Sequence, residues 1–219
     1  MMKEKIINAL EFNKLAYESV KNNFRRGMSE KDVKKIILSA CSAADDFSGD
    51  IVGGVRASKI EGDATDYILK DSDCLLLDLQ FKTGDVWTDT TRTFFISKPT
   101  SEQRKAYELC LLAKKSGESV LKSGVRAYSV YNAVRSAFAP FEENFPHHAG
   151  HLFGKDKLIQ PQFFPERKEA IRKNDFVTLE PGIYFDGKFG IRIEDNYQVT
   201  ESGFVNLFDY PFEIDYFII

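Results

Sequence analysis

Cysteine is scarce in this chain, which has only three in 219 residues. Cys41, Cys74 and Cys110 lie far apart, and no C-x-x-C pair occurs. This pattern indicates neither a zinc knuckle nor a disulfide framework. Each cysteine has apolar neighbours, so we expect buried, unreactive thiols.

Long hydrophobic runs are also absent from the sequence. No apolar stretch approaches the roughly 18 residues that are needed to span a bilayer. The segment Met1–Ile6 has an acidic residue early and lacks the apolar core of a signal peptide. We therefore expect no membrane partner and a reducing, cytoplasmic compartment.

An excess of charge of one sign is missing too. Thirty basic and 33 acidic residues give a formal net charge of −3, which argues against a nucleic-acid partner. An apolar content of 43% and a charged content of 29% are typical of an ordinary globular protein. The length suits one sizeable domain or two small ones.

Helical periodicity opens the first half of the chain. Apolar spacing predicts a helix over residues 2–24, and Ser29 with Asp32 forms an S-x-x-D capping signature for a second helix. Residues 49–54 are rich in glycine and are expected to form a turn. The apolar run Cys74–Phe81 predicts a buried strand, followed by a turn and a return strand over Val86–Ser97.

The second half repeats this order. Ser101 is expected to cap a long helix that ends near Leu121. The pattern then predicts a shorter helix over Ser129–Phe138 and strands over Gly150–Phe153, Phe176–Leu179, Phe189–Ile193 and Tyr197–Thr200. Helix, helix, strands in both halves suggests a duplicated α+β unit, although the halves share no clear sequence repeat. Residues 155–169 form the longest irregular segment, and such loops commonly border pockets.

Two acidic residues of the first half stand in strand-like surroundings. Asp78 lies within Leu75–Leu79, where an unpaired carboxylate costs several kcal/mol to bury. Asp89 follows beyond the predicted turn, so a hairpin can bring the two carboxylates together. Two like charges at close range need a cation or a shared proton. A metal ion, an ion pair with Arg92 and an acid/base pair are all open interpretations at this point.

All the histidines of the chain, His147, His148 and His151, lie within five positions. Imidazole binds first-row transition metals and titrates near neutral pH. Gly150 and Gly154 flank the last histidine and its strand-like run, and glycine permits close backbone approach. His151 is therefore a candidate metal ligand, and a histidine satisfied within the core is the alternative.

Two further acids end apolar runs in the second half. Glu180 follows Phe176–Leu179, and Glu194 alternates with isoleucines that face the core. Arg192 cannot balance both charges. Four carboxylates and one imidazole carry more negative charge than one divalent ion needs, which favours a pair of ions such as Mn, Co, Fe or Zn. Two ions about 3.5–4 Å apart can deprotonate a bridging water and polarise a substrate carbonyl.

The order of these five residues resembles the ligand set of the pita-bread metallopeptidases, which include methionine aminopeptidase, aminopeptidase P, prolidase and the metal-free creatinase. The spacing from Asp78 to Asp89 matches that family. Four stretches resemble the sequence motifs of prolidase and aminopeptidase P more than those of methionine aminopeptidase: Asp89–Phe94, Gly150-His151, Glu180–Tyr184 and Gly190–Asp195. The resemblance covers essentially the whole chain. It implies an α+β, pita-bread (creatinase/aminopeptidase) fold, with pseudo-two-fold α-α-β halves around a curved antiparallel sheet.

The resemblance also implies a division of labour among the five residues. One ion would be held by Asp78, Asp89 and Glu194. The other would be held by Asp89, His151, Glu180 and Glu194, with Glu180 also relaying a proton. Creatinase has lost metal ligands, whereas all five ligand positions are occupied by suitable residues in this chain, so we expect a metal-dependent enzyme. The expected architecture is a single catalytic domain over residues 1–219, with pseudo-repeat halves at about 1–98 and 99–219.

The chain departs from the family at three places. Relatives carry a second histidine about seven residues after the ligand, where this chain has Leu158, and an upstream histidine in the region that here is Ser58–Gly62. The N-terminal domain of prolidase and aminopeptidase P is the third missing feature. His147 stands where Xaa-Pro enzymes have a histidine, and we expect it to act as a catalytic and substrate-binding residue near the oxyanion or the leaving nitrogen. The role of His148 is left open, with a purely structural one as one interpretation.

Other residues near the predicted site have two interpretations each. Arg192 is expected to orient Glu194 or to bind a substrate carboxylate, and a purely structural salt bridge is the alternative. Phe163 and Phe164 are expected to pack onto the core, with a place in a pocket wall as the alternative.

The sequence therefore predicts a dinuclear-metal hydrolase that cleaves an amide bond. An Xaa-Pro aminopeptidase or Xaa-Pro dipeptidase acting on short peptides is the preferred hypothesis. Hydrolysis of a non-peptide amide, or a non-catalytic metal-binding or interaction member of the family, are the alternatives. The expected partners are a small peptide or amide substrate, with a homodimer left open.

Overall fold

The computed structural model describes residues 2–219, and each half of the chain begins with two helices. These helices are α1 (Met2–Asn23) and α2 (Glu30–Ala40), then α3 (Ser101–Val120) and α4 (Ala127–Ser136). None of the helices formed by residues 2–219 is long and apolar enough to cross a membrane.

Side-chain caps fix where two of the helices begin. The Ser29 hydroxyl accepts a hydrogen bond from the Asp32 backbone N–H, and the Asp32 carboxylate accepts one from the Ser29 N–H, which is the capping box predicted for α2. Helix α3 has the same arrangement between Thr100 and Gln103. The predicted cap at Ser101 is therefore wrong by one residue, because Thr100 supplies the hydroxyl.

The first half contributes a four-stranded antiparallel sheet. Its central strand is β2 (Cys74–Thr83), which pairs with β1 (Asp46–Gly53) on one side and with β4 (Thr90–Phe95) on the other, while the short β3 (Val86–Trp87) pairs with the end of β2. The predicted return strand is thus interrupted at Thr88 and Asp89. This break places Asp89 between two strands rather than within one.

Residues 49–54, which we expected to form a turn, belong largely to strand β1, so that prediction is wrong. Gly49 has a φ of +155°, and a Cβ atom at this position would lie 2.1 Å from the carbonyl oxygen of Asp78. Only glycine lets the two strands approach this closely. The glycines therefore reflect close strand pairing next to Asp78, not a chain reversal.

The second half contributes a five-stranded antiparallel sheet and a separate hairpin. The strands of the sheet, in spatial order, are β11 (Phe204–Asn206), β10 (Asp195–Val199), β7 (Phe176–Leu179), β5 (His151–Leu152) and β6 (Ile159–Gln162). The hairpin is made of β8 (Gly182–Phe185) and β9 (Phe189–Arg192). The sequence did not predict β6, β8 or β11.

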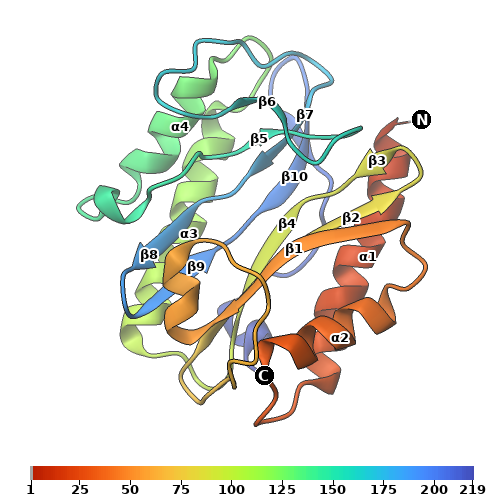
Figure 1. The fold of residues 1–219 in the computed structure, drawn as a ribbon. Helices are drawn as coiled ribbons and strands as arrows, with labels where there is room; N and C mark the ends of the chain where they lie inside the picture. The colour runs from red at the N-terminus through yellow and green to blue at the C-terminus, as the bar shows by residue number, and fades with distance from the viewer. Residues whose placement is uncertain (1) are drawn as a thin grey trace.

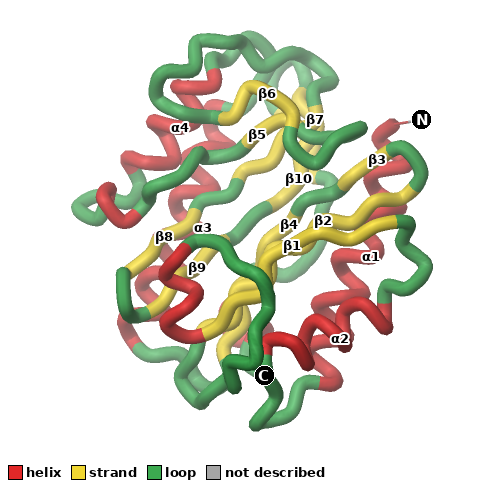
Figure 2. Tube along the Cα trace, viewed as in Figure 1, coloured by secondary structure: helices red, strands yellow, loops and turns green. Residues whose placement is uncertain are grey.

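The strands of the two halves meet in the middle of the molecule, as Figure 1 and Figure 2 show, and helices cover them from outside. Helices α1 and α2 lie beside β1–β4, and α3 and α4 lie beside the strands of the second half. An antiparallel bridge between Thr91 and Glu194 joins the halves. One hydrophobic core contains residues from all four helices and both sheets, so burial of apolar surface holds the halves together.

Three short 3₁₀ helices complete the chain. They are η1 (Gly54–Lys59), η2 (Glu142–Asn144) and η3 (Ile214–Phe217). The first follows β1 directly and leads into the loop that borders the site described next.

Candidate metal centre

A cavity of about 710 Å³ lies where strands of the two halves meet. Its wall combines the five predicted ligands with the other two histidines and one arginine: Asp78, Asp89, His147, His148, His151, Glu180, Arg192 and Glu194. The structure therefore brings every predicted site residue to one cavity.

The first half supplies two carboxylates. Asp78 lies on β2, and its Oδ2 atom accepts a hydrogen bond of 2.5 Å from Nη2 of Arg192. Asp89 lies in the break between β3 and β4, and its Oδ2 accepts one of 2.9 Å from Nε2 of Gln80. The Oδ1 atoms of both residues are buried and find no hydrogen-bond partner among residues 2–219.

Glu194 comes from the second half and shows the same pattern. Its Oε2 accepts a hydrogen bond of 2.8 Å from the hydroxyl of Thr91, whereas Oε1 is buried and unpaired within the described part of the chain. Each of the three carboxylates thus has one oxygen held by the protein and one without a partner. Buried polar atoms are normally satisfied, so three such oxygens in one cavity fit a site for a cation.

The ring of His151 is oriented by its own strand. Its Nδ1–H donates to the carbonyl of Leu152 at 2.9 Å, which leaves Nε2 as the atom with a lone pair. Nε2 lies 3.3 Å from Oδ2 of Asp89 and 3.7 Å from Oε1 of Glu180. A backbone carbonyl on one ring nitrogen and an open lone pair on the other is the usual arrangement of a metal-binding histidine.

A single glycine brings His151 to this position. Gly150 has a φ of +155°, and a Cβ there would lie 2.1 Å from the carbonyl oxygen of Thr178. The close approach sets His151 beside the end of β7, from which Glu180 projects. Gly49 plays the corresponding part beside Asp78 in the first half.

Electrostatic repulsion is strong among these acids. Burial and the charge of Asp78 raise the pKa of Asp89 well above its usual value. Burial and the charge of Asp89 do the same to the pKa of Glu194. Buried carboxylates at this range cannot all ionise without compensation. A divalent ion would supply it, which makes the donor set a good fit for hard and borderline metals.

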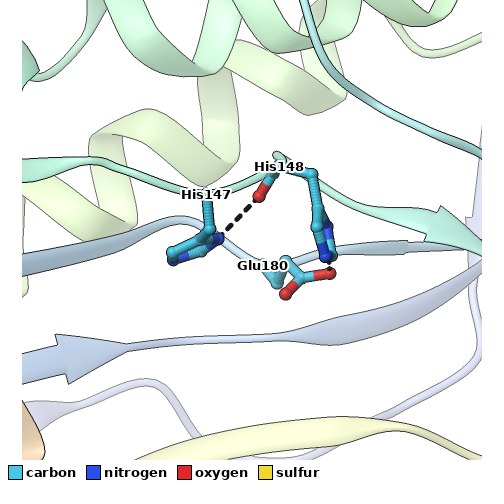
Figure 3. Close-up of side chains that lie close together, drawn as sticks. All are labelled: His147, His148 and Glu180. Atoms are coloured by element: carbon cyan, nitrogen blue, oxygen red, sulfur yellow. Dashed lines mark hydrogen bonds and ion pairs between the residues drawn. The ribbon is translucent and has the colours of Figure 1, made fainter. Parts of the chain in front are cut away.

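Glu180 lies in a different environment. Its Oε1 accepts a hydrogen bond of 3.2 Å from the Thr178 hydroxyl, and Nδ1 of His148 lies 3.1 Å from the same oxygen. Burial raises the pKa of the Glu180 carboxyl, but the neighbouring histidines, His148 first, lower it below its ordinary value. Figure 3 shows the His148 ring directed at this carboxylate.

His147 is engaged at both ring nitrogens. Its Nδ1–H donates to the carbonyl of His148 at 2.7 Å, so Nε2 accepts from the Tyr184 hydroxyl at 3.0 Å. Arg192 in turn donates to that hydroxyl at 2.7 Å. Burial lowers the pKa of His147 to about 3, so its ring is neutral near pH 7. A chain of contacts therefore joins Asp78, Arg192, Tyr184 and His147.

The family assignment rests on a comparison with protein-family models. The model for Peptidase_M24, described as metallopeptidase family M24, matches residues 4–201. The chain belongs to metallopeptidase family M24. That match includes all five residues predicted as ligands.

Individual M24 relatives agree with the assignment. An uncharacterized peptidase of Methanocaldococcus jannaschii is 37% identical over 142 residues, which are 63% of this chain and 41% of that protein. An Xaa-Pro dipeptidase of Pyrococcus horikoshii is 30% identical over 159 residues, which are 72% of this chain and 45% of that protein. The chain thus spans less than half the length of these two relatives.

The fold agrees as well. The crystal structure of an X-Pro aminopeptidase from Thermotoga maritima superposes with a TM-score of 0.95 at 26% identity, covering 100% of this chain and 63% of that one. The α+β pita-bread fold that the sequence predicts is therefore confirmed.

The partners of Arg192 are in keeping with two of its expected roles, a salt bridge and the orientation of Glu194, whereas Arg92 has a different partner from the one suggested. Arg192 forms an ion pair with Asp78, and its Nε donates to the Thr91 hydroxyl that holds Glu194. Contact with a substrate carboxylate stays a prediction. Arg92 does not neutralise Asp89, as one interpretation held, but pairs with Asp195 at 2.7 Å.

The irregular segment over residues 155–169 borders the cavity, as predicted, through Lys157 and Leu158. Phe163 is fully buried, and the ring of Phe164 packs against those of His148 and Tyr131. Both phenylalanines therefore pack, and neither belongs to the cavity wall formed within residues 2–219.

Sequence reasoning assigns no role to two residues of the site. The role of His148 is open from the sequence, and its ring lies against Glu180 in the cavity. Tyr184 belongs to the stretch Glu180–Tyr184 that resembles the family, and in the structure it links Arg192 to His147. The unusual density of three histidines within five positions was the available signal for His148.

Proposed function

We propose that this M24 chain is a dinuclear-metal hydrolase that cleaves Xaa-Pro bonds in short peptides. The observation that carries the proposal is the set of three buried, unpaired carboxylate oxygens from Asp78, Asp89 and Glu194 in one cavity with Nε2 of His151. Three such oxygens would cost several kcal/mol in the absence of a cation.

Two divalent ions, Mn, Co, Fe or Zn, would occupy this set. Asp78, Asp89 and Glu194 would hold one, and Asp89, His151, Glu180 and Glu194 would hold the other. When bound, the ions supply Lewis-acid chemistry, because they lower the pKa of a water molecule and polarise a carbonyl group.

The side chains of the protein then have separate tasks. Thr178 and His148 both approach Oε1 of Glu180, so Oε2 is the oxygen that can accept a proton from the attacking water and pass it to the leaving nitrogen. His147 lines the cavity as a neutral ring and would contact the substrate. Arg192 fixes Asp78 directly and Glu194 through Thr91.

The names of two relatives support this substrate class. The Pyrococcus horikoshii protein is named an Xaa-Pro dipeptidase and the Thermotoga maritima structure an X-Pro aminopeptidase. The family resemblance implies two further histidines, at positions where this chain has Ser58–Gly62 and Leu158, and their replacement keeps a non-peptide amide as the second candidate. A cytoplasmic location, small-peptide partners and a single domain built of two similar halves belong to the same proposal.

Hydrolysis assays test the proposal. Xaa-Pro dipeptides and tripeptides, with Xaa-Ala peptides as controls, should be cleaved by protein loaded with Mn²⁺ or Co²⁺. Glu180→Gln should abolish turnover while the far-UV circular dichroism stays unchanged. Cleavage of non-peptide amides alone would favour the second candidate. A folded protein without turnover in any metal would refute the enzyme and leave a metal-binding or interaction module.

A further inference from the structure

His148 has no part in the five-residue set, although it lies in the same cavity. It precedes strand β5, and its side chain retains only 16% of its exposure. Figure 3 shows its ring pointing at the Glu180 carboxylate, while the ring of His147 points elsewhere.

The Nδ1 atom of His148 is buried without a hydrogen-bond partner in the described part of the chain, like the three carboxylate oxygens described above. No group within residues 2–219 meets hydrogen-bond geometry with it, even though Oε1 of Glu180 is 3.1 Å away. Four of the seven unpaired buried side-chain atoms of the described chain belong to this one cavity, on Asp78, Asp89, Glu194 and His148. Three of these four atoms belong to proposed metal ligands, and the fourth is Nδ1 of His148.

The spacing of the donor atoms fits ligands of a common ion. Metal–nitrogen and metal–oxygen bonds of about 2.0–2.2 Å place two ligands about 3 Å apart at a right angle, and farther apart at wider angles. The His148 Nδ1 to Glu180 Oε1 distance is 3.1 Å, and the His151 Nε2 to Glu180 Oε1 distance is 3.7 Å. His148 and His151 thus approach one carboxylate oxygen from two sides at ligand-like distances.

His147 is close to Glu180 as well, and its ligand atom also belongs to a group that could hold an ion with His148 and Glu180. However, its Nδ1–H is committed to the His148 carbonyl and its Nε2 to the Tyr184 hydroxyl. By contrast, Nδ1 of His148 has no hydrogen-bond partner within residues 2–219, and its close contact is with the Glu180 carboxylate itself.

We propose that His148 is an additional nitrogen ligand of the second ion, the one that Asp89, His151, Glu180 and Glu194 would hold. We call this ion's site the Glu180 end of the centre, and the other ion's site the Asp78 end. This inference rests on the proposed dinuclear function. It gives the Glu180 end two imidazoles, whereas the Asp78 end has carboxylates alone. Imidazole favours Co²⁺ and Zn²⁺ over Mn²⁺ more strongly than carboxylate does. The Glu180 end should therefore fill first when Co²⁺ is added.

Calorimetric titration of the metal-free protein with Co²⁺ and with Mn²⁺ tests the inference without an activity assay. Wild type should bind two ions. His148→Ala and His148→Gln should weaken one of the two Co²⁺ sites by at least the 10–100-fold that loss of an outer-shell partner costs. The loss should be smaller for Mn²⁺. Lys157→Gln is the control, because Lys157 lines the same cavity and its Nζ donates to the Ser48 hydroxyl, and it should leave both Co²⁺ affinities within about three-fold.

Pulsed electron paramagnetic resonance of the Mn²⁺-loaded protein gives a second readout. It should detect two imidazole nitrogens coupled to the metal, and one after His148→Ala. Two ions bound with one coupled imidazole in wild type, or an equal loss of Co²⁺ affinity in Lys157→Gln, would overturn the role of His148 and leave the dinuclear centre standing. A folded wild type that binds neither ion would refute the proposed function itself.

Discussion

The guanidinium of Arg192 lies 2.5 Å from Oδ2 of Asp78, although the two residues are 114 positions apart in the chain. Asp78 belongs to the sheet of the first half, and Arg192 ends strand β9 of the second. The ion pair is almost fully buried, with 3% and 14% of the two side chains exposed. It therefore ties the halves together at the edge of the site and leaves only Oδ1 of Asp78 unpaired.

Arg192→Met should destabilise the metal-free protein by about 3–5 kcal/mol, because it leaves the Asp78 charge buried without a partner. The difference from wild type should shrink in saturating Mn²⁺, since the ion then compensates Asp78. Urea unfolding with and without metal measures both values. Lys188→Met, which breaks the exposed pair with Glu102, is the control and should cost less than about 1 kcal/mol. A comparable loss in both variants would contradict the account.

Asp89→Asn should separate stability from function. The raised pKa of Asp89 shows that its ionised form is unfavourable in the metal-free protein. Asparagine removes that charge and can still accept the hydrogen bond from Gln80. We expect the metal-free variant to gain about 0.5–2 kcal/mol in unfolding free energy and to lose metal binding and turnover. Urea unfolding and Co²⁺ titration measure these effects, with the exposed Asp85→Asn as control. Unchanged Co²⁺ affinity would rule out Asp89 as a ligand.

The stability gained from metal should depend on pH. In the folded protein, the pKa of Asp89 is raised well above the ordinary aspartate value of 3.8, and the pKa of Glu194 well above the ordinary glutamate value of 4.5. Above those values the unfolded chain releases protons that the folded chain retains, so metal-free stability falls as pH rises toward the folded pKa values. Bound metal displaces these protons and removes the penalty. The rise in Tm on adding Mn²⁺ should therefore be larger at pH 8 than at pH 5. An equal rise at both pH values would mean that these carboxyls do not bind the ion.

Gly150→Ala should damage the site through the backbone. The new Cβ would lie 2.1 Å from the Thr178 carbonyl, so β5 must move away from β7 and carry His151 away from Glu180. We expect a loss of at least about 2 kcal/mol in stability and a weaker Co²⁺ site. Gly203→Ala is the control, because no heavy atom of the described residues would lie within 4 Å of its Cβ. Wild-type metal affinity in Gly150→Ala would show that this close approach does not position His151.

The five proposed ligands could be singled out from the sequence because several of them break a local rule. Asp78 and Glu194 place charge in apolar, strand-like runs, and such conflicts mark functional positions. The resemblance to a known family then supplied the fold. Sequence could not supply the partners of the two arginines, since Arg192 finds Asp78 and Arg92 finds Asp195 only after the halves pack.

Short strands and close strand contacts were the features that the sequence concealed. The sequence predicts a turn over residues 49–54, because Gly49 permits both a turn and a strand, and only the carbonyl of Asp78 beside it decides for strand β1. Strands β6, β8 and β11 have three or four residues each, too few to show a period. The helix boundaries differ from the predictions by one or two residues, which side-chain caps explain at Thr100.

The duplicated unit stays a prediction, although the topology is in keeping with it. In the first half β2 is flanked by β1 and β4, and in the second β7 is flanked by β5 and β10. Gly49 and Gly150 have the same φ and approach the central strand of their own half in the same way.

Anomalous diffraction from crystals soaked in Mn²⁺ or Co²⁺ measures the central claim most directly. The account predicts two peaks about 3.5–4 Å apart in the cavity. The first should lie among Asp78, Asp89 and Glu194, and the second among Asp89, His151, Glu180 and Glu194. Absence of any peak at these residues in a fully soaked crystal, or a single peak outside them, would contradict it.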